Sequence, residues 1–255
     1  MYESFLNANY SAKDKSRSVE ALEMKANAIA AYVASKRTDE VDAAMEKLKC
    51  APRHSFELAF NSACAHIVEK EWDSAEEHLE LALRVARDNY ELEDLTEEEI
   101  DEELAPGNIQ LAYVLHCKGQ SSKGIELLTN VLRAKPADAA SMAIGTNNLI
   151  AARGARELFD SLKRFEKVVE KAGRHDLQLS KSLAQKLNQR QQHAIWLNTC
   201  LLYLHSNKHE LCRGALKIFR SHYENSLWAA CVEASLLLKE KKSAGTCHCI
   251  RMSKL

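Results

Sequence analysis

A set of small and aromatic residues returns every 34 positions in this chain. Val41 and Ala75 are 34 residues apart, and the same distance separates Tyr32 from His66. A unit of this length holds a helix, a tight turn and a second helix, and it cannot bury its apolar face without a neighbour. The period therefore predicts an all-α tetratricopeptide-repeat solenoid, a right-handed superhelix of antiparallel helix pairs.

The positions within each repeat support this prediction. Positions 8 and 20 take a small residue where the two helices cross, and positions 4, 7, 11, 24 and 27 fill the space between them. Repeats begin near residues 22, 56, 105, 139 and 193, and a half-repeat begins near 225. The sequence thus predicts three segments: a partly helical lead-in at 1–21, the repeat array at 22–240 and an irregular tail at 241–255.

Two insertions interrupt the period. The repeats at 56 and 105 are 49 residues apart, and the extra residues fall in the acidic stretch 88–103, which we expect to extend the preceding helix and then form a solvated loop. The repeat at 139 is degenerate, because Leu158 stands at position 20. About 20 further residues, over 171–190, are predicted to form a loop between helices.

Composition agrees with many helices and short turns. The 255 residues include only 8 glycines and 3 prolines, far fewer than a sheet protein of this size would need. Lys and Arg number 35 against 36 Asp and Glu, so no global positive field attracts a nucleic acid. The first 15 residues lack the pattern of a secretory signal, and no window approaches 18 apolar residues. We therefore expect a cytosolic chain whose eight cysteines are thiols.

Five segments of the chain together resemble one family. They are SFELAFNSACAHIVEKEWDSAEEHLELAL at 55–83, NIQLAYVLHCKGQSSKGIELLTNVLRAKPAD at 108–138, TNNLI at 146–150, LSKSLAQKL at 179–187 and the helix at 193–203. In this order they are similar to the tetratricopeptide region of the 72-kilodalton subunit of the signal recognition particle. The resemblance covers about residues 55 to 240.

The resemblance implies a role in the ribonucleoprotein that brings nascent secretory chains to the endoplasmic reticulum. In that family the repeats hold a C-terminal segment of the 68-kilodalton subunit, and a lysine-rich region beyond the repeats contacts the particle RNA. This chain has no such basic tail and begins inside the expected array. The resemblance therefore implies binding to the protein partner, and contact with the RNA only indirectly or through other regions.

A partner peptide is expected along the leading helices of the repeats. Positions 2, 5, 6, 9 and 12 lie on one side of each leading helix and face the concave side of such an array. Amides recur there, and an amide offers both a donor and an acceptor to a peptide backbone. The predicted groove residues are Asn27, Phe60, Asn61, Gln110, Tyr113, Asn147 and Asn198. The alternative is that these amides bridge helices and that the aromatic rings are packing residues.

Two other binding functions compete with this one. A co-chaperone or similar adaptor that clamps a peptide carboxylate needs Lys and Arg at positions 2, 5 and 6, but position 2 is Glu23 and Glu57 in the first two repeats. An RNA-reading helical-repeat protein needs a basic groove, which this sequence lacks.

The sequence gives little support for an enzymatic function. Cys247, His248 and Cys249 are spaced too tightly for a four-ligand zinc site, and the pairs His175 with Asp176 and Cys64 with His66 have no third orienting group. We predict no catalytic, metal-binding or cofactor-binding residues. The terminal Ser-Lys-Leu matches a peroxisomal signal, which we interpret as incidental.

Overall fold

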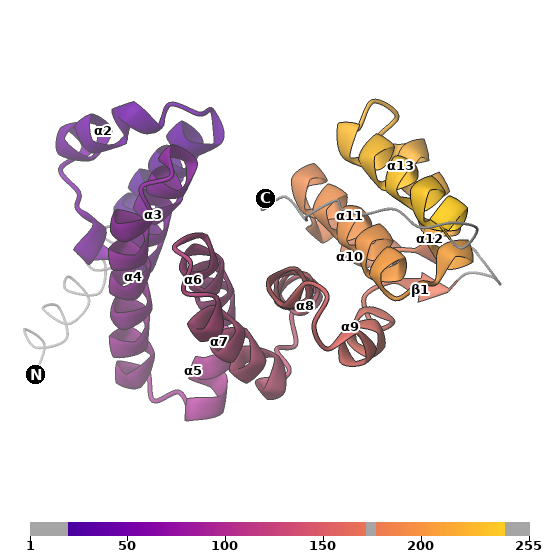
Figure 1. Cartoon of the computed structure of the whole chain (residues 1–255). Helices are drawn as coiled ribbons and strands as arrows, with labels where there is room; N and C mark the ends of the chain where they lie inside the picture. The colour runs from indigo at the N-terminus through magenta and orange to yellow at the C-terminus, as the bar shows by residue number, and fades with distance from the viewer. Residues whose placement is uncertain (1–19, 172–176, 243–255) are drawn as a thin grey trace, which may run out of the picture. The chain divides into compact units, whose positions relative to one another are not determined.

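The structure is a computed structural model that describes residues 20–171 and 177–242. These residues form an all-α repeat fold, as the period predicts (Figure 1). The chain divides into two compact units, Met1–Ala134 and Lys135–Leu255, where the sequence predicts a single array over 22–240. At the boundary between them the preceding helix ends, because Lys135 adopts a left-handed φ of 56° and Pro136 cannot continue a helix.

The described part of unit 1 consists of helices joined by short turns. A helix occupies residues 20–34. It is followed by η1 (Thr38–Glu40), α2 (Val41–Leu48), η2 (Pro52–His54), α3 (Phe56–Glu69), α4 (Trp72–Leu92), α5 (Glu97–Glu103), α6 (Ala105–Cys117) and α7 (Ser121–Ala134).

The described part of unit 2 is also helical apart from one short antiparallel ladder. Its elements are α8 (Ala139–Arg153), α9 (Leu158–Phe165), β1 (Glu170–Lys171), β2 (Leu177–Gln178), α10 (Lys181–Lys186), α11 (Gln189–His205), α12 (His209–His222) and α13 (Leu227–Lys242). Residues 241 and 242, which the sequence places in the irregular tail, belong to α13, and the rest of the tail lies outside the described residues. Most of the lead-in, 1–19, also lies outside them.

Small residues close the helix crossings in the first two repeats. Ala63 and Ala75, at positions 8 and 20 of the second repeat, are fully buried in one cluster with Leu79. Ile29 and Val41 occupy the same positions of the first repeat and are buried together in another cluster. The helix pairs therefore pack at the two positions that the period singles out.

Close approach at positions 8 and 20 recurs in two later repeats. A Cβ atom on Gly124 would lie 2.8 Å from the Ala112 carbonyl oxygen, a distance that real Cβ atoms do not reach. The Cys212 thiol donates to the Cys200 carbonyl oxygen, with Sγ and O 3.4 Å apart. At each crossing a side chain larger than the native one would push a backbone aside.

The turn inside each regular repeat is the same. Position 15 takes a left-handed φ in four repeats, at Lys36 (61°), Lys70 (64°), Gly119 (83°) and Asn207 (55°). In each, the amide at position 16 donates to the carbonyl oxygen at position 11, with N and O 2.9 to 3.0 Å apart. This is the hydrogen bond of a Schellman motif, which ends a helix by satisfying a carbonyl of its last turn.

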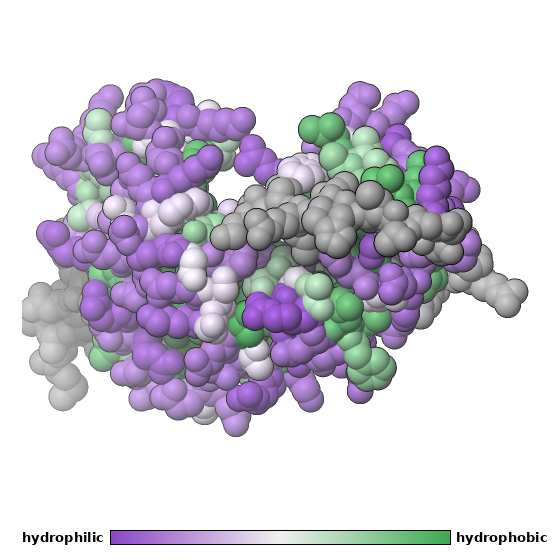
Figure 2. Space-filling model, viewed as in Figure 1, coloured by the Kyte–Doolittle hydropathy of each residue, from purple (hydrophilic) through white to green (hydrophobic). Residues whose placement is uncertain are grey.

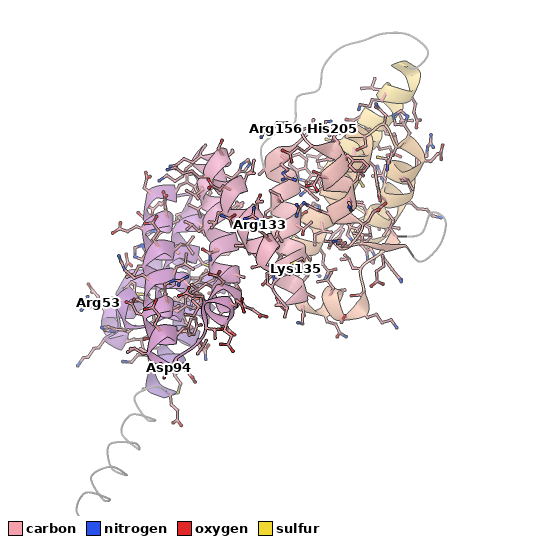
Figure 3. All side chains as sticks on the ribbon, turned by 90° about the horizontal axis from the view of Figure 1, so that it is seen from below. Arg53, Asp94, Arg133, Lys135, Arg156 and His205 are labelled. Atoms are coloured by element: carbon pink, nitrogen blue, oxygen red, sulfur yellow. The ribbon has the colours of Figure 1, made fainter. Side chains whose placement is uncertain are left out.

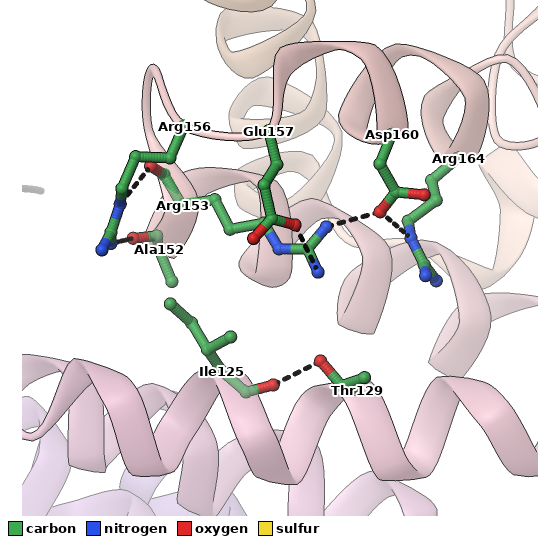
Figure 4. Close-up of polar contacts among 8 residues, drawn as sticks. All are labelled: Ile125, Thr129, Ala152, Arg153, Arg156, Glu157, Asp160 and Arg164. Atoms are coloured by element: carbon green, nitrogen blue, oxygen red, sulfur yellow. Dashed lines mark hydrogen bonds and ion pairs between the residues drawn. The ribbon is translucent and has the colours of Figure 1, made fainter.

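The degenerate fourth repeat lacks this turn. Arg153, at position 15, stays in α8, and the left-handed φ values come later, at Gly154 (60°) and Glu157 (52°). The Arg153 side chain is only 9% exposed; its two Nη atoms pair with Asp160 at 2.6 Å and with Glu157 at 3.1 Å (Figure 4). Asp160 also accepts from Arg164 Nε at 2.6 Å, and this bond, followed by that from Arg153, lowers the pKa of Asp160.

The acidic insertion differs from the solvated loop expected after an extended helix. α4 does extend to Leu92, but after a turn that includes Asp94 (φ 58°, labelled in Figure 3) the chain forms α5. The Thr96 side chain accepts from the Glu99 amide, and Glu99 accepts from the Thr96 amide, so a capping box begins α5. Ile100 is buried against Ala86 on α4, which anchors the insertion.

The second insertion also holds more structure than a loop. β1 and β2 pair Glu170 with Gln178, and residues 172–176 lie outside the described part of the chain. α10 follows, with Ser180 accepting from the Leu183 amide as its N-cap. Lys186 at the end of α10 donates to Asp138, the N-cap of α8, at 2.9 Å; this bond, followed by that from the Ser141 amide, lowers the Asp138 pKa to about 2.

Candidate partner-binding surface

The predicted groove residues lie on the leading helix of each repeat. In unit 1 these are the helix at 20–34, α3 and α6, which carry Asn27, Phe60, Asn61, Gln110 and Tyr113. In unit 2 they are α8 and α11, which carry Asn147 and Asn198. We call the first set the unit 1 face and the second set the unit 2 face, and we describe each by itself.

Two aromatic side chains of the unit 1 face share one apolar cluster. Phe60 on α3 and Tyr113 on α6 are half-buried and pack against the buried cluster that contains Ala63 and Val114. The Tyr113 ring also meets the Trp72 ring edge-on, with centroids 6.4 Å apart. Both residues therefore have a packing role, and each leaves part of its ring open to a partner.

The hydroxyl of Tyr113 is not a ready proton donor to bulk water. Burial, aided by the neighbouring Cys117 thiol, raises the pKa of Tyr113 to about 12. The hydroxyl therefore stays neutral over the physiological range. A neutral phenol can both donate to and accept from a peptide backbone.

The amides of the unit 1 face differ in how much of their bonding capacity is used. Asn61 Nδ2 donates to the Ala26 carbonyl oxygen at 3.0 Å and thereby ties α3 to the helix at 20–34. Gln110 is half-buried and its side chain makes no hydrogen bond among the described residues, and Asn27 is exposed. A bound peptide would find the whole Gln110 amide and the Asn61 carbonyl oxygen available.

The unit 2 face contains a chain of three amides. Asn198 Nδ2 on α11 donates to Asn147 Oδ1 on α8 at 2.9 Å, and Asn147 Nδ2 donates to Asn148 Oδ1 at 3.4 Å. Asn147 is only 5% exposed, so its amide joins helices rather than facing solvent. The half-buried Asn198 retains its carbonyl oxygen for a partner. Asn148 is absent from the predicted groove residues, although it belongs to the paired asparagines of the segment TNNLI.

The charges beside these faces do not suit an anionic ligand end. Glu23 and Glu57, at position 2 of the first two repeats, are exposed, and the same position holds Pro106, Ala140 and Ala194 in later repeats. Lys118, at the C-cap of α6, is engaged by Asp73 at 2.5 Å and by Glu76. The arrangement offers apolar contact and amide hydrogen bonds, and the described residues at position 2 of these helices form no clamp for a carboxylate.

The residues considered for catalysis or metal binding do not form a site in the described part of the chain. Burial raises the pKa of Cys64 to about 11, which disfavours the nucleophilic thiolate. His66 instead bonds Glu71, with Nδ1 and Oε2 2.7 Å apart. No metal-binding group of three His, Cys, Asp or Glu occurs among the described residues, while His175, Asp176 and the triplet 247–249 lie outside them.

Within the described ranges, no helix combines the length and the apolar character needed to cross a membrane.

Comparison with known proteins finds relatives over most of the chain. "Signal recognition particle subunit SRP72" of Caenorhabditis elegans is 35% identical over 185 residues, which are 72% of this chain and 27% of that protein. The protein of the same name from Dictyostelium discoideum is 28% identical over 232 residues, 88% of this chain and 34% of that protein. The human protein of this name is 29% identical over 187 residues, 73% of this chain and 26% of that protein.

The chain thus spans about a quarter to a third of the length of the curated relatives it matches. No family model matches it.

Proposed function

Because this chain is homologous to one region of the signal recognition particle subunit SRP72, we propose that it is the helical-repeat part of such a subunit and acts as a non-enzymatic scaffold. The scaffold would serve co-translational targeting of proteins to the endoplasmic reticulum, in a particle that is cytoplasmic and cycles to that membrane. The observation that carries the proposal is the homology over most of the chain.

We propose further that the scaffold binds a segment of the 68-kilodalton subunit. The partly open rings of Phe60 and Tyr113 supply apolar contact area, and Gln110 lies on the same helix as Tyr113. Such a surface suits a peptide that contributes apolar side chains and main-chain hydrogen bonds. The near-neutral charge, −1 for the whole chain, supports a protein partner, with the particle RNA reached only indirectly or through other regions.

Calorimetry of the chain against the C-terminal segment of the 68-kilodalton subunit tests the proposal. The variant Gln110→Ala removes an amide that has no partner among the described residues, so its effect on the protein's own stability is small. We expect Gln110→Ala to weaken binding about fivefold, because one buried hydrogen bond contributes about 1 kcal/mol and 1.4 kcal/mol is tenfold. The double variant with Asn61→Ala is expected to weaken binding further.

The matched control is Asn89→Ala, which removes an exposed amide on α4, a second helix of a repeat. This variant should bind like the native chain. Failure of the native chain to bind the segment would refute the proposed partner. Normal binding by the folded double variant would refute the unit 1 face as the contact surface and leave the partner in place.

A further inference from the structure

Two histidines lie side by side inside the second repeat. The rings of His66 on α3 and His78 on α4 have centroids 4.8 Å apart. They occupy positions 11 and 23 of the repeat, where the other regular repeats carry no imidazole. The corresponding pairs are Tyr32 with Ala44, Leu115 with Leu127, and Tyr203 with Ala215. Helix packing at these positions therefore does not require a histidine.

The same nitrogen of each ring is already engaged. His66 Nδ1 bonds Glu71 Oε2 at 2.7 Å, and His78 Nδ1 bonds the Ser74 carbonyl oxygen at 2.9 Å. An ionised carboxylate and a carbonyl oxygen can only accept, so each neutral ring carries its proton on Nδ1. Both Nε2 atoms then carry a lone pair, and neither atom has a partner among the described residues.

Hydrogen bonds of this kind orient histidines around a metal ion. A histidine that ligates zinc through Nε2 commonly donates its Nδ1 proton to a carboxylate or to a backbone carbonyl. Two imidazoles that share one ion at Zn–N distances of about 2.0–2.1 Å have ring centroids roughly 4.5–5.2 Å apart. The observed separation of 4.8 Å lies in this range. We propose that His66 and His78 bind one Zn²⁺, or a similar divalent transition-metal ion that prefers imidazole, and that water completes its coordination.

The turn between α3 and α4 holds this pair in place. The Glu71 amide donates to the His66 carbonyl oxygen at 2.9 Å, so the residue that accepts from the His66 ring is itself fixed by the Schellman motif. The His66 side chain is 21% exposed, and His78 is half-buried. Both rings therefore stay partly open to solvent, as an ion that keeps water ligands requires.

The charge of unit 1 favours a cation. Unit 1 carries 26 Asp and Glu against 15 Lys and Arg, whereas unit 2 carries 10 against 20. Hydrophilic residues dominate the visible surface of unit 1 (Figure 2). An excess of carboxylates raises the local concentration of cations. The inference does not rest on the function proposed above, because neither histidine belongs to the unit 1 face.

Calorimetric titration of the chain with zinc sulfate at about pH 7.5, where free imidazole is mostly neutral, tests the proposal. Every sample carries Cys247→Ser and Cys249→Ser, because thiolates bind zinc and these two residues lie outside the described part of the chain. We expect a dissociation constant on the order of 10 μM, because two imidazoles supply half the ligands of a structural zinc site. His66→Ala or His78→Ala should raise this constant roughly 100-fold.

The matched control is His54→Ala. His54 is an exposed histidine of the same unit, but its Nδ1 accepts from the Ala51 amide at 3.1 Å, so its proton lies on Nε2. This variant should bind zinc like the chain with native His54. Glu71→Ala removes the carboxylate that orients the His66 ring and leaves both ligands in place, so it should raise the dissociation constant about tenfold.

Nitrogen-15 NMR of the histidine-labelled chain tests the geometry. Without zinc, His66 and His78 should both show the tautomer with the proton on Nδ1. Zinc should then shift both Nε2 resonances at the same ion concentration, because one ion contacts both rings. This measurement uses the native histidines, so it does not depend on the stability of an alanine variant.

Three results would overturn the inference. The first is a chain that binds no zinc up to about 1 mM, far above the expected dissociation constant. The second is binding that His66→Ala and His78→Ala leave as strong as His54→Ala does. The third is a spectrum in which zinc shifts only one of the two rings, since the ion would then not be shared.

Discussion

The second and fourth repeats join their two helices in different ways. In the second, α3 ends at Glu69 and Lys70 turns the chain with a left-handed φ. In the fourth, α8 runs one residue further and includes Arg153, whose side chain turns inward and pairs with Asp160. Both helices are followed by a residue of positive φ, Lys70 or Gly154, but only in the fourth repeat does a buried cation connect the two helices.

The difference follows from position 20. Ala75 occupies it in the second repeat and is fully buried, so α4 lies close against α3. Leu158 occupies it in the fourth repeat, is only partly buried, and begins the short helix α9. A bulky side chain at the crossing prevents the same close approach, and the ion pairs around Arg153 then connect the two helices. Small residues at a crossing thus permit a regular repeat, and their loss has to be offset by other contacts.

The largest loss of stability is expected where a substitution blocks the close crossing of the two helices of a repeat. Ala75→Arg overpacks a fully buried position and buries a charge, so we expect a loss of at least about 4 kcal/mol in the free energy of unfolding, measured by urea denaturation. Leu158→Arg changes the matching position of the fourth repeat. Because Leu158 is partly exposed, the variant should lose less of the free energy of unfolding, about 1–2 kcal/mol. Equal losses at the two positions would contradict the comparison.

Substitutions at the buried Arg153 and its partner Asp160 in the fourth repeat should have the next largest effect on stability. Asp160→Ala leaves the buried Arg153 with one remaining carboxylate, Glu157, and should cost about 1–3 kcal/mol in urea denaturation. Arg153→Met removes the buried charge and leaves Asp160 paired with Arg164, so it should cost less than about 1 kcal/mol. If Arg153→Met destabilises the protein more than Asp160→Ala, then the ion pairs of Arg153 stabilise the protein by more than the burial of its charge costs.

Variants of two glycines test whether backbone atoms approach each other closely only where the two helices of a repeat cross. Gly124→Ala drives a Cβ atom to 2.8 Å from the Ala112 carbonyl oxygen, a backbone atom, and should cost about 1–2 kcal/mol. Gly107→Ala meets instead the Cδ2 atom of Leu83, the movable end of a side chain, at the same distance. Its better helix propensity should make it neutral or stabilising by up to about 1 kcal/mol. Thermal denaturation of both variants in parallel measures this difference in stability.

The smallest expected effect concerns the turn of the regular repeat. Lys70→Gly places glycine where φ is 64° and should raise the free energy of unfolding by about 0.5–1 kcal/mol, because an L side chain is disfavoured there. Lys217→Gly, at an exposed position inside α12, should instead lower it by about 1 kcal/mol. A loss at both positions would show that the left-handed turn does not favour glycine here.

The regular repeats could be predicted because their signals are local. The period of 34 identifies positions 8 and 20 from residue spacing alone, and Ala63 and Ala75 lie where it predicts. The structure of the two insertions was harder to predict, because few residues in them carry a signal for helix or strand. The start of α5 was nevertheless signalled, since Thr96 followed three residues later by Glu99 is a capping box. Ser180 before α10 carried a weaker signal of the same kind.

The candidate surface was predicted only in part. The leading-helix positions of Gln110 and Asn198 follow from helical periodicity. The bonds that the amides make inside the molecule do not, because Asn61 bonds a carbonyl 35 residues away and Asn198 bonds an amide 51 residues away. Such pairings depend on how close two helices come, which depends in turn on every side chain between them.

The sequence by itself determined the all-α class, the helix pairs and the small residues at their crossings, because helix formation and a 34-residue period depend on short-range spacing. Only the tertiary structure decided that Arg153 is buried and that Asn147 joins two helices. The physical reason is that burial of a charge or an amide depends on the distance between helices, which neighbouring residues in the chain do not set.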